Sequence, residues 1–225
     1  MQIAPASNSA DGSATQRTYL AIRRMIVAGV IKPGEKLKIE QLRTRLDTGA
    51  SPIREALSLL TSEHLVTRID QRGFRAAETS RKNFNEILEM RCELEEMALR
   101  KSIGRATDAW EEGVMLANYR MVRARQQGGE KFEDLHKAFH MALLANCDAP
   151  ILLQFCSQLY DLNIRYRYLA GLALNYQKRD VDTEHRRIME CAIARDADTA
   201  SAELKSHYRQ TGAFIAELIG EDVSD

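Results

Sequence analysis

Four of the five histidines lie in the C-terminal half of the chain, at spacings that could bring them together. His136 and His140 are four residues apart, so on one helix their imidazoles share a face and can chelate one ion. His185 and His207 lie on separate later helical segments. An H-x-x-x-H pair alone is more often structural, but four nitrogen ligands from three helices suit zinc, nickel or a similar divalent metal ion.

The region that carries these histidines, residues 80–222, has helical periodicity and no convincing strand pattern. Apolar spacing together with glycine and proline breaks predicts six helices. Their ranges are 81–103, 107–127, 130–146, 149–176, 178–195 and 197–219. Helix bundles build metal and ligand sites from facing side chains, so an all-α six-helix bundle is the fold that would position the histidines.

A second stretch that could do chemistry is residues 49–57. Pro52 suits the first turn of a helix, and Ser51 before it is the predicted N-cap. Apolar residues recur from Ile53 at helical spacing and leave Arg54 on the exposed face. A capped helix with small polar residues and an arginine fits the DNA major groove. The alternative for Arg54 is a surface ion pair with Glu55, Glu63 or another carboxylate.

The elements around this helix favour a winged helix-turn-helix over residues 14–78. Together with the helical bundle, this region makes the predicted fold class mainly α. Helices from residue 15 to Gly29 and over 39–46 precede an Asp47-Thr48-Gly49 turn. Two β-prone runs, 65–69 and 74–77, flank a hairpin turn that forms a small wing. The candidate DNA-binding residues are Arg43, Arg45, Thr48, Gly49, Ser51, Pro52, Arg54, Arg72 and Gly73. For Arg43 and Arg45, phosphate contact and simple solvation both stay open.

Length and charge set broad limits. A chain of 225 residues with 44% hydrophobic content can bury two modest cores. Lys+Arg and Asp+Glu each number 32, but residues 1–78 hold 12 basic against 8 acidic residues. This asymmetry is weak support for a basic N-terminal binding module. Residues 1–13, rich in Ala, Ser and Asn, are expected to form a disordered leader.

The cysteines and the hydropathy favour a cytoplasmic protein with no membrane partner. The four cysteines show no C-x-x-C pairing and fall in helical patterns, so buried thiols are expected rather than disulfides. No run approaches the roughly 18 apolar residues that a membrane span needs. The N-terminus also lacks the basic-then-apolar layout of a signal peptide.

Residues 15–78 resemble the winged helix-turn-helix of the GntR family of bacterial transcription regulators, whose core reads roughly L-G-V-S-R-T-P-V-R-E-A-L before a wing with R-G. The matching run is Leu46-Asp47-Thr48-Gly49-Ala50-Ser51-Pro52-Ile53-Arg54-Glu55-Ala56-Leu57, followed by Gln71-Arg72-Gly73-Phe74. The family's arginine before Thr/Ser-Pro falls on Ala50. The resemblance therefore implies that one DNA contact is missing, worth about 1–3 kcal/mol if it was bidentate to a base. Arg54 and Arg72 would then carry more of the recognition.

The helical region is similar to the FCD ligand-binding domain of the FadR-like branch of that family, and its six helices resemble the VanR-type group. The family's metal motif is D-x-x-x-H with two further histidines on the last two helices, which His140, His185 and His207 match. His136 occupies the aspartate position, which makes the implied site softer and more positive. The pattern R-x-x-L-E-x-x-A implies that Arg91 binds an effector carboxylate. The alternative is an Arg91–Glu95 pair at i, i+4.

These observations predict a ligand-responsive bacterial DNA-binding transcription regulator and no enzyme. The winged helix of a homodimer would bind a near-palindromic operator, and the bundle would bind a small carboxylate-containing effector beside the metal ion. The resemblance implies a repressor. Two alternatives stay open. Glu133-x-x-His136 is like half of a di-iron motif, although a second E-x-x-H is missing. In the second alternative, the helical domain serves only for dimerisation and the histidines have no metal-binding role.

Overall fold

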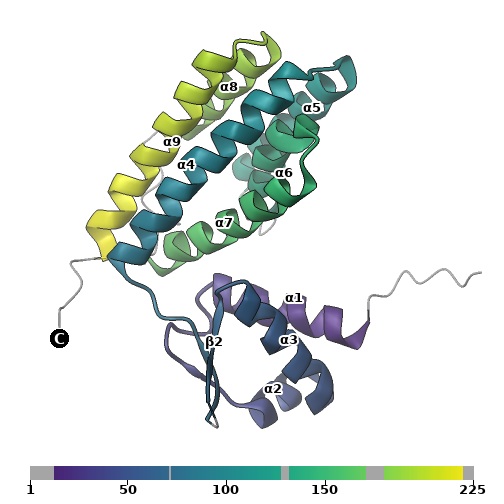
Figure 1. The fold of residues 1–225 in the computed structure, drawn as a ribbon, viewed down its shortest axis with the longest axis vertical. Helices are drawn as coiled ribbons and strands as arrows, with labels where there is room; N and C mark the ends of the chain where they lie inside the picture. The colour runs from purple at the N-terminus through teal and green to yellow at the C-terminus, as the bar shows by residue number, and fades with distance from the viewer. Residues whose placement is uncertain (1–12, 71, 128–131, 171–179, 220–225) are drawn as a thin grey trace, which may run out of the picture. The chain divides into compact units, whose positions relative to one another are not determined.

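The structure is a computed structural model that describes residues 13–70, 72–127, 132–170 and 180–219. The chain divides into two compact units, Met1–Glu78 and Thr79–Asp225. The first holds short helices with a small sheet, and the second is helical (Figure 1). The predicted fold class, mainly α with a winged helix-turn-helix and an all-α six-helix bundle, is confirmed. The expected leader falls on residues 1–12 and Ser13, and all but Ser13 lie outside the described residues.

Three helices form the core of the N-terminal unit: α1 (Ala14–Val27), α2 (Ile39–Leu46) and α3 (Ala50–Ser62). Ile22 and Ile26 of α1 and Ile53 and Leu57 of α3 are fully buried. These positions recur at i, i+4, so each helix turns one apolar stripe toward the other. Asp47, in the left-handed conformation at φ 45°, ends α2 and turns the chain into α3. Helix α3 is thereby held against α1 along its buried side.

The start of α3 differs from the sequence prediction. The helix begins at Ala50, with Gly49 as an N-cap that has no side-chain hydrogen bond. Ser51 therefore lies inside the first turn, and its prediction as the N-cap is wrong; its hydroxyl donates to Glu55 Oε1 at 2.9 Å instead. The first turn accepts Pro52 because its backbone N–H groups have no intrahelical acceptors. Sequence alone missed the earlier start because Pro52 also suits the first helical position.

The wing belongs to a three-stranded antiparallel sheet of order β1-β3-β2, from β1 (Lys36–Leu37), β2 (Val66–Ile69) and β3 (Gly73–Ala76). The two-residue β1 was missed because it is too short to show an alternating pattern. Val66 pairs with Ala76, and both are buried. One residue further along each strand, Arg75 lies between Lys36 and Thr67, all exposed. The sheet thus places basic side chains on its outer face.

The C-terminal unit contains α4 (Arg81–Gly104), α5 (Asp108–Gln126), α6 (Phe132–Leu144), α7 (Pro150–Leu169), α8 (Val181–Ile193) and α9 (Ala197–Ile219). A short 3₁₀ turn, η1 (Ala145–Cys147), follows α6. Ser80, Thr107 and Asp180 cap α4, α5 and α8 through their side chains. Helix α7 ends at Leu169, with Ala170 as its cap, so the predicted continuation through Ala170 is wrong, and its remainder lies outside the described residues.

Helices α4 and α9 run side by side along the bundle (Figure 1) and share the most extensive contact in this unit. Phe139, Leu143, Leu99 and Ile188 lie at the centre of its core and are fully buried. Trp110 is buried as well and donates its indole N–H to the carbonyl of Ala142. All four cysteines carry free thiols. Among the described helices, none is long and apolar enough to cross a membrane.

Candidate metal centre and nucleic-acid interface

The four histidines singled out by spacing meet inside the helical unit. His136 and His140 come from successive turns of α6, His185 from α8 and His207 from α9. Their exposed fractions are 4%, 1%, 1% and 3%. One ring nitrogen of each lies within 4.8 Å of the corresponding atoms of the other three. The arrangement is a buried cluster of four imidazoles with no carboxylate among the converging atoms.

The distances within the cluster suit a metal ion. Nε2 of His136 lies 3.1 Å from Nε2 of His185 and 3.1 Å from Nε2 of His140. Metal–nitrogen bonds of about 2.0–2.1 Å place adjacent ligand nitrogens about 2.8–3.4 Å apart, for angles from about 90° to tetrahedral. These two distances are therefore within the range expected for ligands around one centre.

Hydrogen bonds on the outer edges of the rings orient them. Nδ1 of His136 lies 2.7 Å from the Tyr160 hydroxyl, and Nδ1 of His140 lies 2.9 Å from the Tyr208 hydroxyl. Nδ1 of His207 lies 2.7 Å from Glu184 Oε2. Such outer contacts leave Nε2 to face a metal. The sequence did not predict these partners. Glu184 and Tyr208 are chain neighbours of His185 and His207, and adjacent residues on a helix point in different directions, so their contacts with other histidines could not be expected.

Burial disfavours the charged form of His136 and His140. Desolvation, followed by the neighbouring histidines and Arg167, lowers the pKa of His136 well below its ordinary value. Burial also lowers the pKa of His140 strongly, with the other histidines and Arg91 adding to the effect. A neutral imidazole has the lone pair that a metal needs, so these two side chains are held in the form that can bind a metal ion.

Arg91 lies beside the cluster and is only 5% exposed. Its Nε donates to Glu95 Oε1 at 2.7 Å, and its Nη1 donates to Asn163 Oδ1 at 2.9 Å. Its Nη2 is buried and has no hydrogen-bond partner among the described residues. The Arg91–Glu95 pair anticipated from the i, i+4 spacing is thus present. Nη2 of the guanidinium is the donor group that could bind a ligand.

Arg91 and three of the histidines line one cavity. Its walls include Arg91, Arg167, His136, His140, His207 and Tyr208. The cavity has a volume of about 20 Å³, room for about one water molecule. Arg167 also lines this cavity, and its Nη2 lies 3.2 Å from Glu133 Oε1. Buried arginines and three of the clustered histidines therefore line the same space, which suits an anion.

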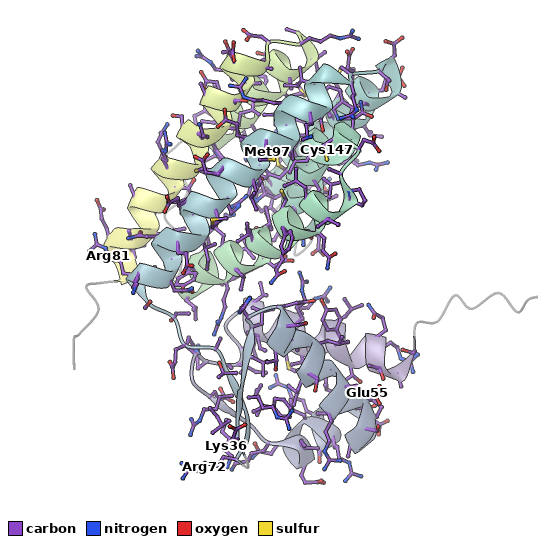
Figure 2. All side chains as sticks on the ribbon, in the orientation of Figure 1. Lys36, Glu55, Arg72, Arg81, Met97 and Cys147 are labelled. Atoms are coloured by element: carbon purple, nitrogen blue, oxygen red, sulfur yellow. The ribbon has the colours of Figure 1, made fainter. Side chains whose placement is uncertain are left out.

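The residues proposed to contact DNA lie on the surface of the N-terminal unit. Arg45, Arg54, Arg72, Gly49, Ser51 and Gly73 are exposed, and Thr48 and Pro52 are partly buried. Arg43 is also exposed but pairs with Glu40 at 2.8 Å. Figure 2 shows Arg72 at the end of the β2–β3 hairpin. The predicted hairpin turn includes Gln71, which lies outside the described residues.

The carboxylates considered as partners for Arg54 are occupied. Glu55 accepts hydrogen bonds from Thr15 at 2.8 Å and from Ser51, while Glu63 accepts one from Tyr19 at 2.6 Å. These bonds from Thr15 and Ser51 lower the pKa of Glu55. Arg54 has no ion pair within the described part of the chain.

Two family models match this chain. Residues 14–75 match the model described as "Bacterial regulatory proteins, gntR family", and residues 86–210 match the "FCD domain". The chain belongs to the GntR family and carries an FCD domain. The family recognised from the P-I-R-E-A-L run and the histidine spacing is therefore confirmed.

Relatives of this GntR regulator agree with that assignment. It is 32% identical over 197 residues to the HTH-type transcriptional repressor GlaR of Escherichia coli (strain K12), covering 84% of this chain and 90% of that protein. It is 32% identical over 213 residues to the HTH-type transcriptional regulator BphR of Paraburkholderia xenovorans (strain LB400), covering 92% and 86%. The structure of E. coli McbR/YncC has the same fold, with a TM-score of 0.81, 20% identity, and coverage of 93% of this chain and all of that one.

The GntR regulator is thus a DNA-binding transcription regulator, and the families and relatives are regulators rather than enzymes. This removes the metalloenzyme alternative. Its buried histidine cluster can hold a metal ion. Ala50, where the family resemblance placed an arginine, is the first residue of α3. The outer face of the wing sheet adds Lys36 and Arg75 as basic groups that the sequence patterns did not single out.

Proposed function

We propose that this GntR regulator is a repressor that a small carboxylate-containing effector releases from its operator, and that the effector binds beside a divalent metal ion in the helical unit. The single observation that carries the proposal is that Arg91 and three of the four clustered histidines line one buried cavity. A buried site lined by positive groups favours an anion, because charges attract more in low dielectric than in water.

The metal ligands are His136, His140, His185 and His207. Four imidazoles suit zinc or nickel better than the hard ions that prefer oxygen. A bound ion would supply a positive charge and an open or exchangeable position for a carboxylate oxygen. Since the cluster offers no carboxylate, the ion's charge is not neutralised by its protein ligands, which strengthens the attraction for an anionic effector.

Arg91 holds the effector from the other side. A guanidinium binds a carboxylate through two parallel N–H groups, and Nη2 is the donor group left without a protein partner. The cavity in its present form is too small for an organic acid, so side chains must move when one binds. An effector that fits only the rearranged form shifts the protein toward it, as ligand control of a second site requires.

The DNA-binding surface comprises Arg43, Arg45, Thr48, Gly49, Ser51, Pro52, Arg54, Arg72 and Gly73. Exposed Arg54 on the first turns of α3 supports base contact in the major groove, and exposed Arg72 and Gly73 at the wing support phosphate or minor-groove contact. In a homodimer two such surfaces meet two half-sites, so the operator is near-palindromic.

A thermal-shift screen tests the effector proposal. Carboxylic acids, sugar acids and amino acids are added to zinc-loaded and to chelator-stripped protein, because a ligand that binds the folded state raises its melting temperature. We expect a carboxylate to stabilise the zinc-loaded form more than the stripped form. Arg91→Lys keeps the charge but loses the planar fork, and it should reduce that shift. A carboxylate shift of equal size in stripped protein and in Arg91→Lys would refute the proposed site.

Repression is tested with the same ligand. A DNA duplex selected for binding from a random pool is titrated with the zinc-loaded protein, followed by fluorescence anisotropy. The stabilising carboxylate should weaken DNA binding, because it favours the protein arrangement that binds DNA less well. Tighter DNA binding with the carboxylate would contradict release and indicate activation by ligand.

A further inference from the structure

Two tyrosines connect Arg91 to the histidine cluster. The Arg91 guanidinium carbon lies 4.1 Å from the ring centroid of Tyr208 on α9 and 5.0 Å from that of Tyr160 on α7. The hydroxyls of the same two tyrosines contact Nδ1 of His140 and Nδ1 of His136. Each tyrosine thus touches the arginine with its face and a candidate metal ligand with its hydroxyl.

The Tyr208 hydroxyl has a defined hydrogen-bond direction. It donates to Glu95 Oε2, which as a carboxylate oxygen can only accept. A hydroxyl has one proton, so the contact of 2.9 Å between Tyr208 and His140 must use the proton of the imidazole. His140 is therefore protonated at Nδ1, and the lone pair of its Nε2 points into the cluster, where Nε2 of His136 is 3.1 Å away.

Glu95 is itself fixed by Arg91. Its Oε1 accepts the 2.7 Å hydrogen bond from Arg91 Nε, and its other oxygen accepts from Tyr208. Glu95 is 1% exposed, so no solvent replaces either bond. A chain of contacts therefore runs from Arg91 through Glu95 and Tyr208 to His140. The contact of Tyr160 does not determine which nitrogen of His136 carries the proton. Nδ1 of His136 also lies 3.3 Å from Arg167 Nη1, which can only donate.

We propose that Tyr208 is a positioning residue that fixes His140 as a metal ligand and couples it to Arg91. The inference rests on the proposed function, since it requires a metal ion at the histidines. Glu95 polarises the Tyr208 hydroxyl, which accepts the Nδ1 proton of His140 and makes Nε2 a stronger electron donor. Any ligand that changes the Arg91–Glu95 contact then changes the metal affinity, and linkage makes the effect reciprocal.

The test measures metal affinity alone. Tyr208→Phe keeps the ring over Arg91 and removes only the hydroxyl. Zinc affinity, determined by competition with a chromogenic chelator, should fall about 10- to 100-fold, the usual effect of losing such an outer partner. Tyr119→Phe, at a residue that is 59% exposed on α5, is the matched control and should bind zinc like the wild type. The absorption spectrum of the cobalt-loaded Tyr208→Phe protein should change, because His140 is no longer held in one orientation.

Two further variants extend the chain of contacts. Glu95→Gln weakens the acceptor for Tyr208 and should also lower zinc affinity, so the proposal stays testable if Tyr208→Phe does not fold. Arg91→Lys keeps the charge but cannot hold both Glu95 and Asn163, and it should lower zinc affinity by a smaller factor. Wild-type zinc affinity and an unchanged cobalt spectrum in Tyr208→Phe would overturn the inference while leaving the metal site standing. Absence of zinc binding by the wild type would instead overturn the proposed function and this inference with it.

Discussion

Nε2 of His136 lies 3.1 Å from Nε2 of His140, one helical turn further along α6. Buried imidazoles do not gather so closely without a hydrogen-bonding or metal-binding reason, because each carries polar nitrogens that must be satisfied. Here the outer nitrogens already have partners in Tyr160 and Tyr208. The Nε2 atoms of His136 and His140 face one another, and a cation held between them could satisfy both.

Replacing His136 by aspartate should change which metal binds. His136→Asp restores the carboxylate that the family resemblance implies at this position and supplies a harder ligand with one negative charge. We expect the ratio of zinc to manganese affinity to fall, measured by competition titrations with both ions. His64→Asn, which removes the fifth histidine at a positive φ of 61° that asparagine tolerates, is the control. An unchanged ratio in His136→Asp would mean that His136 is not a ligand.

Arg54→Ala should weaken binding to the selected operator. Loss of a bidentate base contact costs about 1–3 kcal/mol, or roughly 5- to 150-fold in affinity. The side chain is exposed, so the melting temperature should stay within error of the wild type. Arg24→Ala, an exposed arginine on α1 of the same unit, controls for loss of charge. Normal operator affinity in Arg54→Ala, measured by fluorescence anisotropy, would rule out the proposed base contact from α3.

Gly212→Ala should reduce effector affinity with little loss of stability. A methyl group at Gly212 would meet Cδ2 of Leu88 at 2.2 Å, and both residues line the cavity. The flexible end of Leu88 can move, and alanine is about 1 kcal/mol better than glycine inside a helix, so the two effects on stability largely offset each other. The carboxylate found in the screen should bind more weakly, by calorimetry. Adding Leu88→Ala should restore binding; if the double variant stays as weak as Gly212→Ala, crowding is not the cause.

Alkaline pH should loosen the N-terminal unit through Tyr19. Burial, followed by the hydrogen bond to Glu63, raises the pKa of Tyr19 to about 12. The unfolded value is about 10, so the stabilising effect is fully present below pH 10 and is lost as pH rises toward 12. Tyr19→Phe should remove this part of the pH dependence of unfolding by denaturant. The tyrosinate absorbance should also lose one late-titrating group; an unchanged titration curve would contradict the assignment.

Much of the site followed from spacing, and the rest depended on long-range packing. His136 and His140 share a face by helical geometry, and His185 and His207 join them because the later helices pack into the same bundle. Tyr160 and Glu184 could not be foreseen, since only the three-dimensional packing of α7 against α6 and of α8 against α9 brings them to the rings. The i, i+4 pair of Arg91 and Glu95 was visible, but its link to Tyr208, 113 residues from Glu95, was not.

The limits of the helices and strands were likewise predicted where the local sequence pattern is strong and missed where it is weak. Helices with a strong apolar period, such as α2 and α9, have the predicted limits. The start of α3 was misplaced because Ser51 and Pro52 carry start signals that also fit the first turn. Strand β1 has two residues and exists only through its pairing with β3, so local pattern gives no sign of it.

The most direct test is the zinc content of the purified chain. Protein stripped with chelator is titrated with zinc, and bound metal is counted by mass spectrometry after dialysis. We expect one zinc ion per chain in the wild type and none retained in the double variant His140→Ala/His185→Ala, with a melting temperature that zinc raises only in the wild type. Failure of the wild type to retain zinc, or equal retention by the double variant, would contradict a zinc site at the four histidines.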